Sequence, residues 1–177
     1  SRDLYHWDRV ADRAIFIGIE PWDGITYDTA QVAVCGSPIV RNDEIWIYYE
    51  GARFRGLAEI YPKEYEPYFK DYAALHLAKL RLDGFVSIHA DYRGGEFTTR
   101  PLRFKGRDLV INFATSGVGT VRVELQNEGG KPIEGFRLEQ CPEIYGDRIQ
   151  HVVAWKDGSD VSALAGKPVR LRFMMKD

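Results

Sequence analysis

Hydrophobic and polar positions alternate with a period of two along most of the chain, in short runs separated by turn residues, as in β-strands. In the first half these runs predict a four-stranded antiparallel unit over residues 31–90. Its first strand bends at Gly36-Ser37-Pro38, and the two-residue turn Asn42-Asp43 leads into the second strand. The third and fourth strands are expected at residues 75–82 and 85–90.

The second half also predicts strands. They are expected at residues 109–114, 120–126, 149–155 and 169–175. Short strands with turn signals about every ten residues favour a β-sandwich. One helical turn is expected at residues 160–166. The sequence as a whole therefore predicts an all-β fold.

A long insertion, residues 52–74, separates the second expected strand from the third. It is rich in tyrosine and phenylalanine, which argues against plain disorder. Loops of this length in compact domains are usually functional or mobile. The insertion is therefore a candidate binding segment.

The composition argues against a nucleic-acid-binding protein, a membrane-spanning protein and a disulfide scaffold. The chain has 177 residues, 24 basic and 26 acidic side chains and a net charge of −2, without the clustered basic footprint of a nucleic-acid-binding protein. No run of about 18 apolar residues predicts a membrane span, and no signal peptide is visible. Cys35 and Cys141 are too few for a disulfide scaffold, and we expect two buried free thiols.

A short turn motif occurs twice. Residues 1–7 and residues 80–87 both place Asp shortly after Arg and before an aromatic residue, and a hairpin lies between the two copies. A recurring turn that brackets a hairpin is typical of sheet-repeat proteins. Because a repeat unit cannot bury both faces alone, we expect it to pack against further repeats or another chain.

Three runs carry a resemblance to a known family: Leu80-Arg81-Leu82-Asp83-Gly84-Phe85-Val86-Ser87, then residues 109–116, then residues 160–173. Together they resemble the end of five-bladed β-propeller glycoside hydrolases of the levanase/invertase and arabinanase type, and the tail of large bacterial glycosidase-like proteins. The resemblance implies a partial propeller over residues 1–92, holding the end of one blade and the final blade, followed by a jelly-roll-like β-sandwich over residues 93–177.

The same resemblance bears on function. In those enzymes the catalytic carboxylates come from earlier blades, and this chain lacks their Arg-Asp-Pro and Glu-Cys motifs, so no catalytic residue carries over. It implies a non-catalytic C-terminal portion of a carbohydrate-active protein, secreted or periplasmic, that associates with the missing blades or with another chain. The alternatives are a carbohydrate-binding module and a structural interaction module.

Six residues are candidates for contact with a sugar, because aromatic rings pack on sugar C–H faces while carboxylates accept hydroxyl hydrogen bonds. They are Trp22, Asp23, Tyr27, Asp28, Glu50 and Arg53. An alternative assigns structural roles to them: Asp23 and Asp28 form Asx turns, and Glu50 pairs with Arg53.

Candidates in the second half are weaker. Its aromatic candidates for binding carbohydrate are Trp155, Tyr145 and Phe136, with Trp155 expected in the core. No cofactor is expected, although Ca²⁺ is conceivable because several acidic residues could supply oxygen ligands. Those residues are Glu139, Glu143, Asp147, Asp157 and Asp160.

Overall fold

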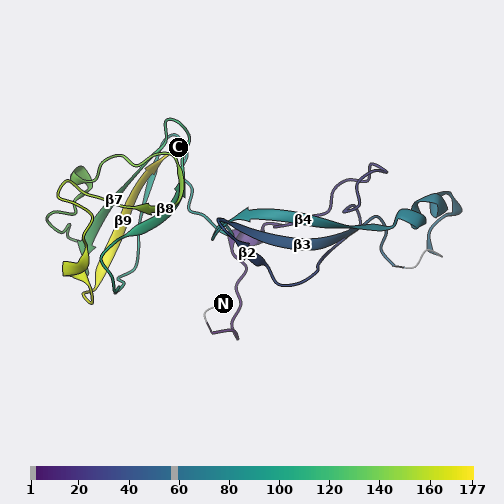
Figure 1. Cartoon of the computed structure of the whole chain (residues 1–177), viewed down its shortest axis with the longest axis horizontal. Coiled ribbons are helices and arrows are strands. Elements are labelled where there is room, and N and C mark those ends of the chain that lie inside the picture. The colour runs from purple at the N-terminus through teal and green to yellow at the C-terminus, as the bar shows by residue number, and fades with distance from the viewer. Residues whose placement is uncertain (1–2, 57–59) are drawn as a thin grey trace. The chain divides into compact units, whose positions relative to one another are not determined.

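A computed structural model describes residues 3–56 and 60–177 of the chain, and it confirms the all-β prediction. The strands form several antiparallel sheets (Figure 1). The longest described helix is a single 3₁₀ segment, η3, at Lys63–Asp71. The chain divides into two compact units, Ser1–Ser87 and Ile88–Asp177, and each is described separately below.

The first unit is a single sheet built from one long hairpin and a bent edge. Its strands are β1 (Gln31–Val34), β2 (Ile39–Arg41), β3 (Glu44–Ala52) and β4 (Ala73–Arg81). β3 pairs with β4 along its whole length, from Glu44 opposite Arg81 to Ala52 opposite Ala73. β1 and β2 both pair with the other side of β3, so they are two parts of the bent first strand that the sequence predicts.

The fourth expected strand is absent. Phe85–Ala90 begins in a turn and continues as irregular chain, and none of it belongs to a strand. Asp83 adopts a left-handed conformation (φ 57°), and the ring of Phe85 contacts that of Phe16 in a tilted pair, with 5.7 Å between the ring centres. Alternation alone does not make a strand, because a strand is stable only when a neighbouring edge pairs with it.

The first copy of the repeated turn motif is also not followed by a strand. Residues 3–10 contain bends and irregular chain but no strand, and residues 1–2 lie outside the described part. The expected blade end at residues 1–7 therefore does not form within residues 3–7.

The second unit has two sheets. β5 (Gly95–Thr98), β9 (Val169–Lys176) and β7 (Thr120–Asn127) form one sheet in that order. β6 (Val110–Ala114) and β8 (Asp147–Val152) form the other. Short 3₁₀ turns lie at η4 (Leu138–Gln140) and η5 (Ser162–Leu164), the latter within the expected helical turn. A third, η1 (Ala11–Arg13), belongs to the first unit.

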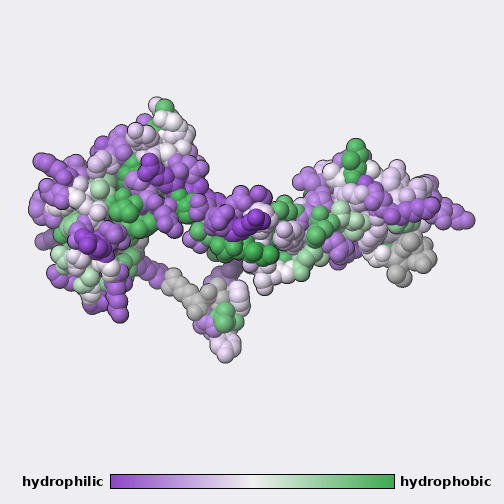
Figure 2. Space-filling view, in the orientation of Figure 1, coloured by the Kyte–Doolittle hydropathy of each residue, from purple (hydrophilic) through white to green (hydrophobic). Residues whose placement is uncertain are grey.

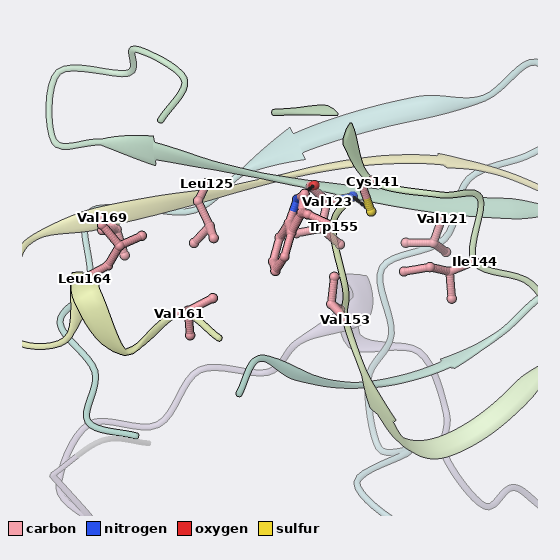
Figure 3. Packing of buried hydrophobic residues seen from close by; sticks show 10 residues of the cluster. All are labelled: Val121, Val123, Leu125, Cys141, Ile144, Val153, Trp155, Val161, Leu164 and Val169. Atoms are coloured by element: carbon pink, nitrogen blue, oxygen red, sulfur yellow. Dashed lines mark hydrogen bonds between the residues drawn. The ribbon is translucent and has the colours of Figure 1, made fainter. Parts of the chain in front are cut away.

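One hydrophobic cluster fills the second unit. Its buried members come from β7, β9, η5 and the chain after η4 and after β8, and they point toward one another in Figure 3. They are Val121, Val123, Leu125, Cys141, Ile144, Val153, Trp155, Val161, Leu164 and Val169. Trp155 is 3% exposed and donates its Nε1–H to the carbonyl of Val123 at 2.9 Å, as expected for a core residue.

The two cysteines have different environments. Both are free thiols, as predicted. Cys141 is buried, and burial raises the pKa of its thiol, while the Val123 N–H donates to its Sγ at 3.3 Å. Cys35 is exposed, so the prediction of two buried thiols is wrong for Cys35, which lies at the bend of the sheet edge.

Candidate functional site

The candidate site is at the end of the first unit where β3 ends and β4 begins. The loop that joins them includes η3, and residues 20–30 run beside it. A buried arginine ties the two segments together, and a group of aromatic rings lies next to it.

Arg53 is the centre of this arrangement. It directly follows β3 and is 8% exposed. Its guanidinium donates to the carbonyl oxygens of Ile25 (2.6 Å), Thr26 (3.3 Å) and Asp71 (3.2 Å). The cation also lies 4.1 Å from the centre of the Tyr27 ring, within cation–π range. Arg53 therefore fixes residues 25–27 against the β3–β4 loop.

Asp71 completes this anchor. Its Oδ2 accepts hydrogen bonds from the Tyr27 hydroxyl and from Arg53 Nη1, the latter at 3.4 Å. The hydrogen bond that Tyr27 donates to this carboxylate raises the pKa of the phenol. Among the described residues Arg53 forms its ion pair with Asp71 and not with Glu50, as the alternative had assumed. No sequence pattern singled out Asp71, which is 18 residues from Arg53.

Asp28 lies on one face of β3. Its Oδ2 accepts a hydrogen bond from the Tyr49 hydroxyl at 3.2 Å, and the Tyr49 ring stacks on His76 at 4.9 Å. Burial, followed by the bond to Asp28, raises the pKa of Tyr49. A Cβ at Gly51 would lie 2.9 Å from both Asp28 Cβ and His76 Nε2, so only glycine allows this close approach.

Glu50 is separated from the other candidates. It lies within β3, not at its end, because the strand continues to Ala52. Successive side chains point to opposite faces of a strand, so Glu50 projects away from the face of Tyr49 and Gly51. Asp28 packs on the face of β3 that carries Tyr49 and Gly51. The structure thus brings Tyr27, Asp28 and Arg53 together and leaves Glu50 exposed on the other side of the sheet.

Asp23 forms an Asx turn. Its Oδ1 accepts hydrogen bonds from the backbone N–H groups of Ile25 and Thr26, both at 2.7 Å, and from the Thr26 hydroxyl at 3.0 Å. The backbone donors lower the pKa of Asp23. The alternative of a turn-making role is therefore correct for Asp23. These three hydrogen bonds all go to Oδ1, and Asp23 itself is exposed.

Trp22 belongs to an aromatic cluster. The cluster consists of Trp22, Phe54, Tyr61, Tyr65, Tyr68 and Phe69. Phe54 is its buried centre, 4% exposed, with the ring of Phe69 at 4.7 Å and that of Trp22 at 5.5 Å. Trp22 is 45% exposed and meets Tyr68 edge-on, at 5.5 Å and 83°. The cluster presents an exposed ring in a fixed orientation.

The described residues include no candidate site for a metal ion. Among residues 3–56 and 60–177 no group of three His, Cys, Asp or Glu side chains is placed to hold one. Two of the acidic residues considered for calcium are engaged in ion pairs, Glu143 with Arg122 and Asp160 with Arg107, both at 3.0 Å. None of the described helices has the length and apolar character to cross a membrane.

The comparisons with known proteins give no relative: no family model, no curated protein and no solved structure matches the chain.

Proposed function

We propose that this chain is a non-catalytic part of a carbohydrate-active protein and that it contacts an oligo- or polysaccharide at Trp22. The observation that carries the proposal is the exposed Trp22 ring, packed against Phe54, Tyr65 and Tyr68. A ring that neighbouring rings already hold in place loses little conformational freedom when a ligand binds to it. Tryptophan also offers a broad apolar face for sugar C–H groups.

Asp23 supplies the polar half of such a contact. It is adjacent to Trp22 in sequence, and its Oδ1 bonds fix the turn. Because those bonds lower its pKa, the carboxylate is ionised at neutral pH and acts as an acceptor for hydroxyl hydrogen bonds. Tyr68, 38% exposed, meets Trp22 edge-on, and the corner between the two rings is the place where we propose that the edge of a sugar ring packs.

A physical argument supports the non-catalytic role proposed for this chain. Glycosidic cleavage requires two carboxyl groups on either side of the bond, one of them held protonated by a raised pKa. The pKa of Asp23 is lowered, and Glu50 and Asp28 lie on opposite faces of β3. This geometry suits binding better than acid catalysis.

We assign the first unit to a propeller-type blade and the second to a β-sandwich as part of the same proposal. The bent first strand, the two-residue turn at Asn42-Asp43 and the β3–β4 hairpin support the blade. A blade of four strands requires one more strand beside β4. Two sheets with one hydrophobic cluster support the sandwich.

Affinity electrophoresis on a panel of soluble polysaccharides tests the binding proposal. We expect at least one polysaccharide to retard the chain and Trp22→Ala to abolish the retardation. Trp7→Ala is the matched control, because Trp7 is 71% exposed and lies outside the aromatic cluster. Absence of retardation on every polysaccharide, or equal loss in both variants, would contradict the proposal.

An activity assay tests the non-catalytic part. We expect no hydrolysis of β-fructan, arabinan or aryl-glycosides by the purified chain. Hydrolysis that disappears in Asp23→Asn or Glu50→Gln would overturn it.

A further inference from the structure

The outer edge of β4 is open for pairing. Arg53 N–H donates to the Tyr72 carbonyl at 3.0 Å, and Leu82 N–H donates to the Asp43 carbonyl at 2.8 Å. Since bonded and non-bonded pairs alternate in an antiparallel ladder, the even-numbered residues of β4 bond to β3. The N–H and C=O groups of Ala73, Leu75, Leu77 and Lys79 therefore point away from the sheet.

This edge is long and regular. The β3–β4 register runs through nine residue pairs without a bulge, and β4 contains no proline. Within the described part of the chain β4 pairs with β3 alone. Leu75 is 67% exposed and Leu77 is 38% exposed, although both belong to a regular strand. Figure 2 shows apolar surface along the strands of this unit.

The opposite edge of the sheet is interrupted. Between the pairs Val34–Tyr49 and Ile39–Trp46, four residues of the edge (35–38) lie opposite two residues of β3 (47 and 48). Pro38 has no N–H to donate to an incoming strand. Bulges and prolines are common ways to prevent an edge strand from pairing. Each copy of the chain therefore has one pairing-competent edge in this sheet.

We propose that β4 pairs with β4 of a second copy, antiparallel and about a two-fold axis, to form a closed dimer. Among the two-fold registers of this strand, one forms two leucine pairs. With Leu75 opposite Leu77 of the second copy, two leucine pairs form, and each Lys79 lies opposite Ala73. The outward-pointing N–H and C=O groups of the two copies also lie opposite one another, because each of these pairs joins two odd-numbered residues.

Neighbouring registers are poorer. A shift by two residues leaves one leucine pair instead of two: either Leu77 lies opposite Leu77 and Leu75 opposite Lys79, or Leu75 lies opposite Leu75 and Leu77 opposite Ala73. The dimer closes at two copies because the edge at β1 and β2 is interrupted, so the sheet does not grow further. The sugar contact proposed at Trp22 lies at the loop end of the unit and does not depend on this inference, whereas β4 of the second copy takes the place beside β4 where the blade assignment requires a further strand.

Sedimentation velocity on the full chain over a range of concentrations tests the dimer. We expect a monomer–dimer equilibrium and no larger species. Leu77→Pro removes an outward N–H without removing a β3–β4 hydrogen bond, and we expect it to raise the dissociation constant at least about tenfold. Val34→Pro is the matched control on the interrupted edge, where the Val34 N–H also points outward, and it should leave the equilibrium unchanged.

A pair of lysine variants and a cysteine variant keep the test decisive if either proline variant misfolds. Leu77→Lys places two added charges near the axis and should weaken the dimer, whereas Val34→Lys should not. Oxidation of a chain carrying Leu75→Cys and Leu77→Cys, with Cys35→Ser, should give a covalent dimer, because directly opposed residues lie within disulfide reach. A chain that remains monomeric at its highest soluble concentration, or that forms extended polymers, would overturn the proposal.

Discussion

In the second unit ten buried hydrophobic side chains form one cluster, whereas in the first unit the buried hydrophobic residues described are Ile45, Ile47, Ala52 and Phe54. The first unit instead exposes large apolar side chains, including Leu75 at 67%. Its loop end is held by a buried arginine and a cluster of aromatic rings that meet in tilted and edge-on contacts. The comparison teaches that the second unit contains most of the apolar stabilisation, while the first has surfaces available for contacts.

The sharpest test of this contrast is Trp155→Ala. It removes the largest side chain of the buried cluster and its hydrogen bond to Val123. We expect the free energy of unfolding of the second unit to fall by about 3–5 kcal/mol. Urea denaturation followed by far-ultraviolet circular dichroism measures it. Tyr145→Ala, at a 70% exposed site in the same unit, is the control and should have little effect.

Arg53→Ala tests the anchor of the first unit. The substitution leaves the carbonyl groups of Ile25 and Thr26 without their donor, which should cost about 2 kcal/mol. We expect faster proteolysis at residues 20–30 and 53–72 while the second unit is unaffected. Arg55→Ala is the control, because the Arg55 side chain is exposed. Equal proteolysis of the two variants would show that the anchor does not stabilise the loop.

Gly51→Ala tests the close approach beneath Asp28. The added methyl group would lie 2.9 Å from Asp28 Cβ, so either the strand or residues 25–30 must shift. Overpacking of this kind costs about 1–3 kcal/mol. Gly36→Ala on the same sheet is a matched control, since no atom lies within 4 Å of its added Cβ. Thermal denaturation compares the two, and similar melting temperatures would contradict the packing described.

The smallest expected effect is a dependence on alkaline pH. Tyr27 and Tyr49 have raised pKa values, so the folded first unit favours the neutral phenols. Their stabilisation is complete below the ordinary tyrosine pKa and is lost as pH rises through the folded values. Ultraviolet titration of tyrosinate, together with proteolysis of residues 20–30, follows the loss. Tyr27→Phe should make the loop less sensitive to pH, and an unchanged profile would contradict the role of Asp71.

Sequence reasoning recovered the strands best where both a period and a partner exist. Ile45–Tyr49 lies within β3 and pairs throughout with β4, and both ends of this run also pair with β1 or β2. The alternation of residues 120–126 corresponds to β7. Phe85–Ala90 has a similar pattern but no partner strand. Pairing over distance is not visible in a local pattern, which explains this error.

The candidate site was predictable only in part, because contacts between distant segments are not visible in a local pattern. Trp22 and the aromatic insertion were identified by residue type, and the rings meet in the structure. Asp71, the partner of Arg53, was not identified, because η3 brings Asp71 back to the end of β3 only after folding. The alternation of β3 does place Glu50 away from Asp28, although the sequence grouped the two.

Hydrogen–deuterium exchange on the intact chain tests most directly that stability is concentrated in the second unit. We predict that amides of β7 and β9 exchange only through global unfolding, while amides of β4 and the loop at residues 60–72 exchange through openings of much lower free energy. Equal protection of the two units, or slower exchange in the first unit, would contradict the account.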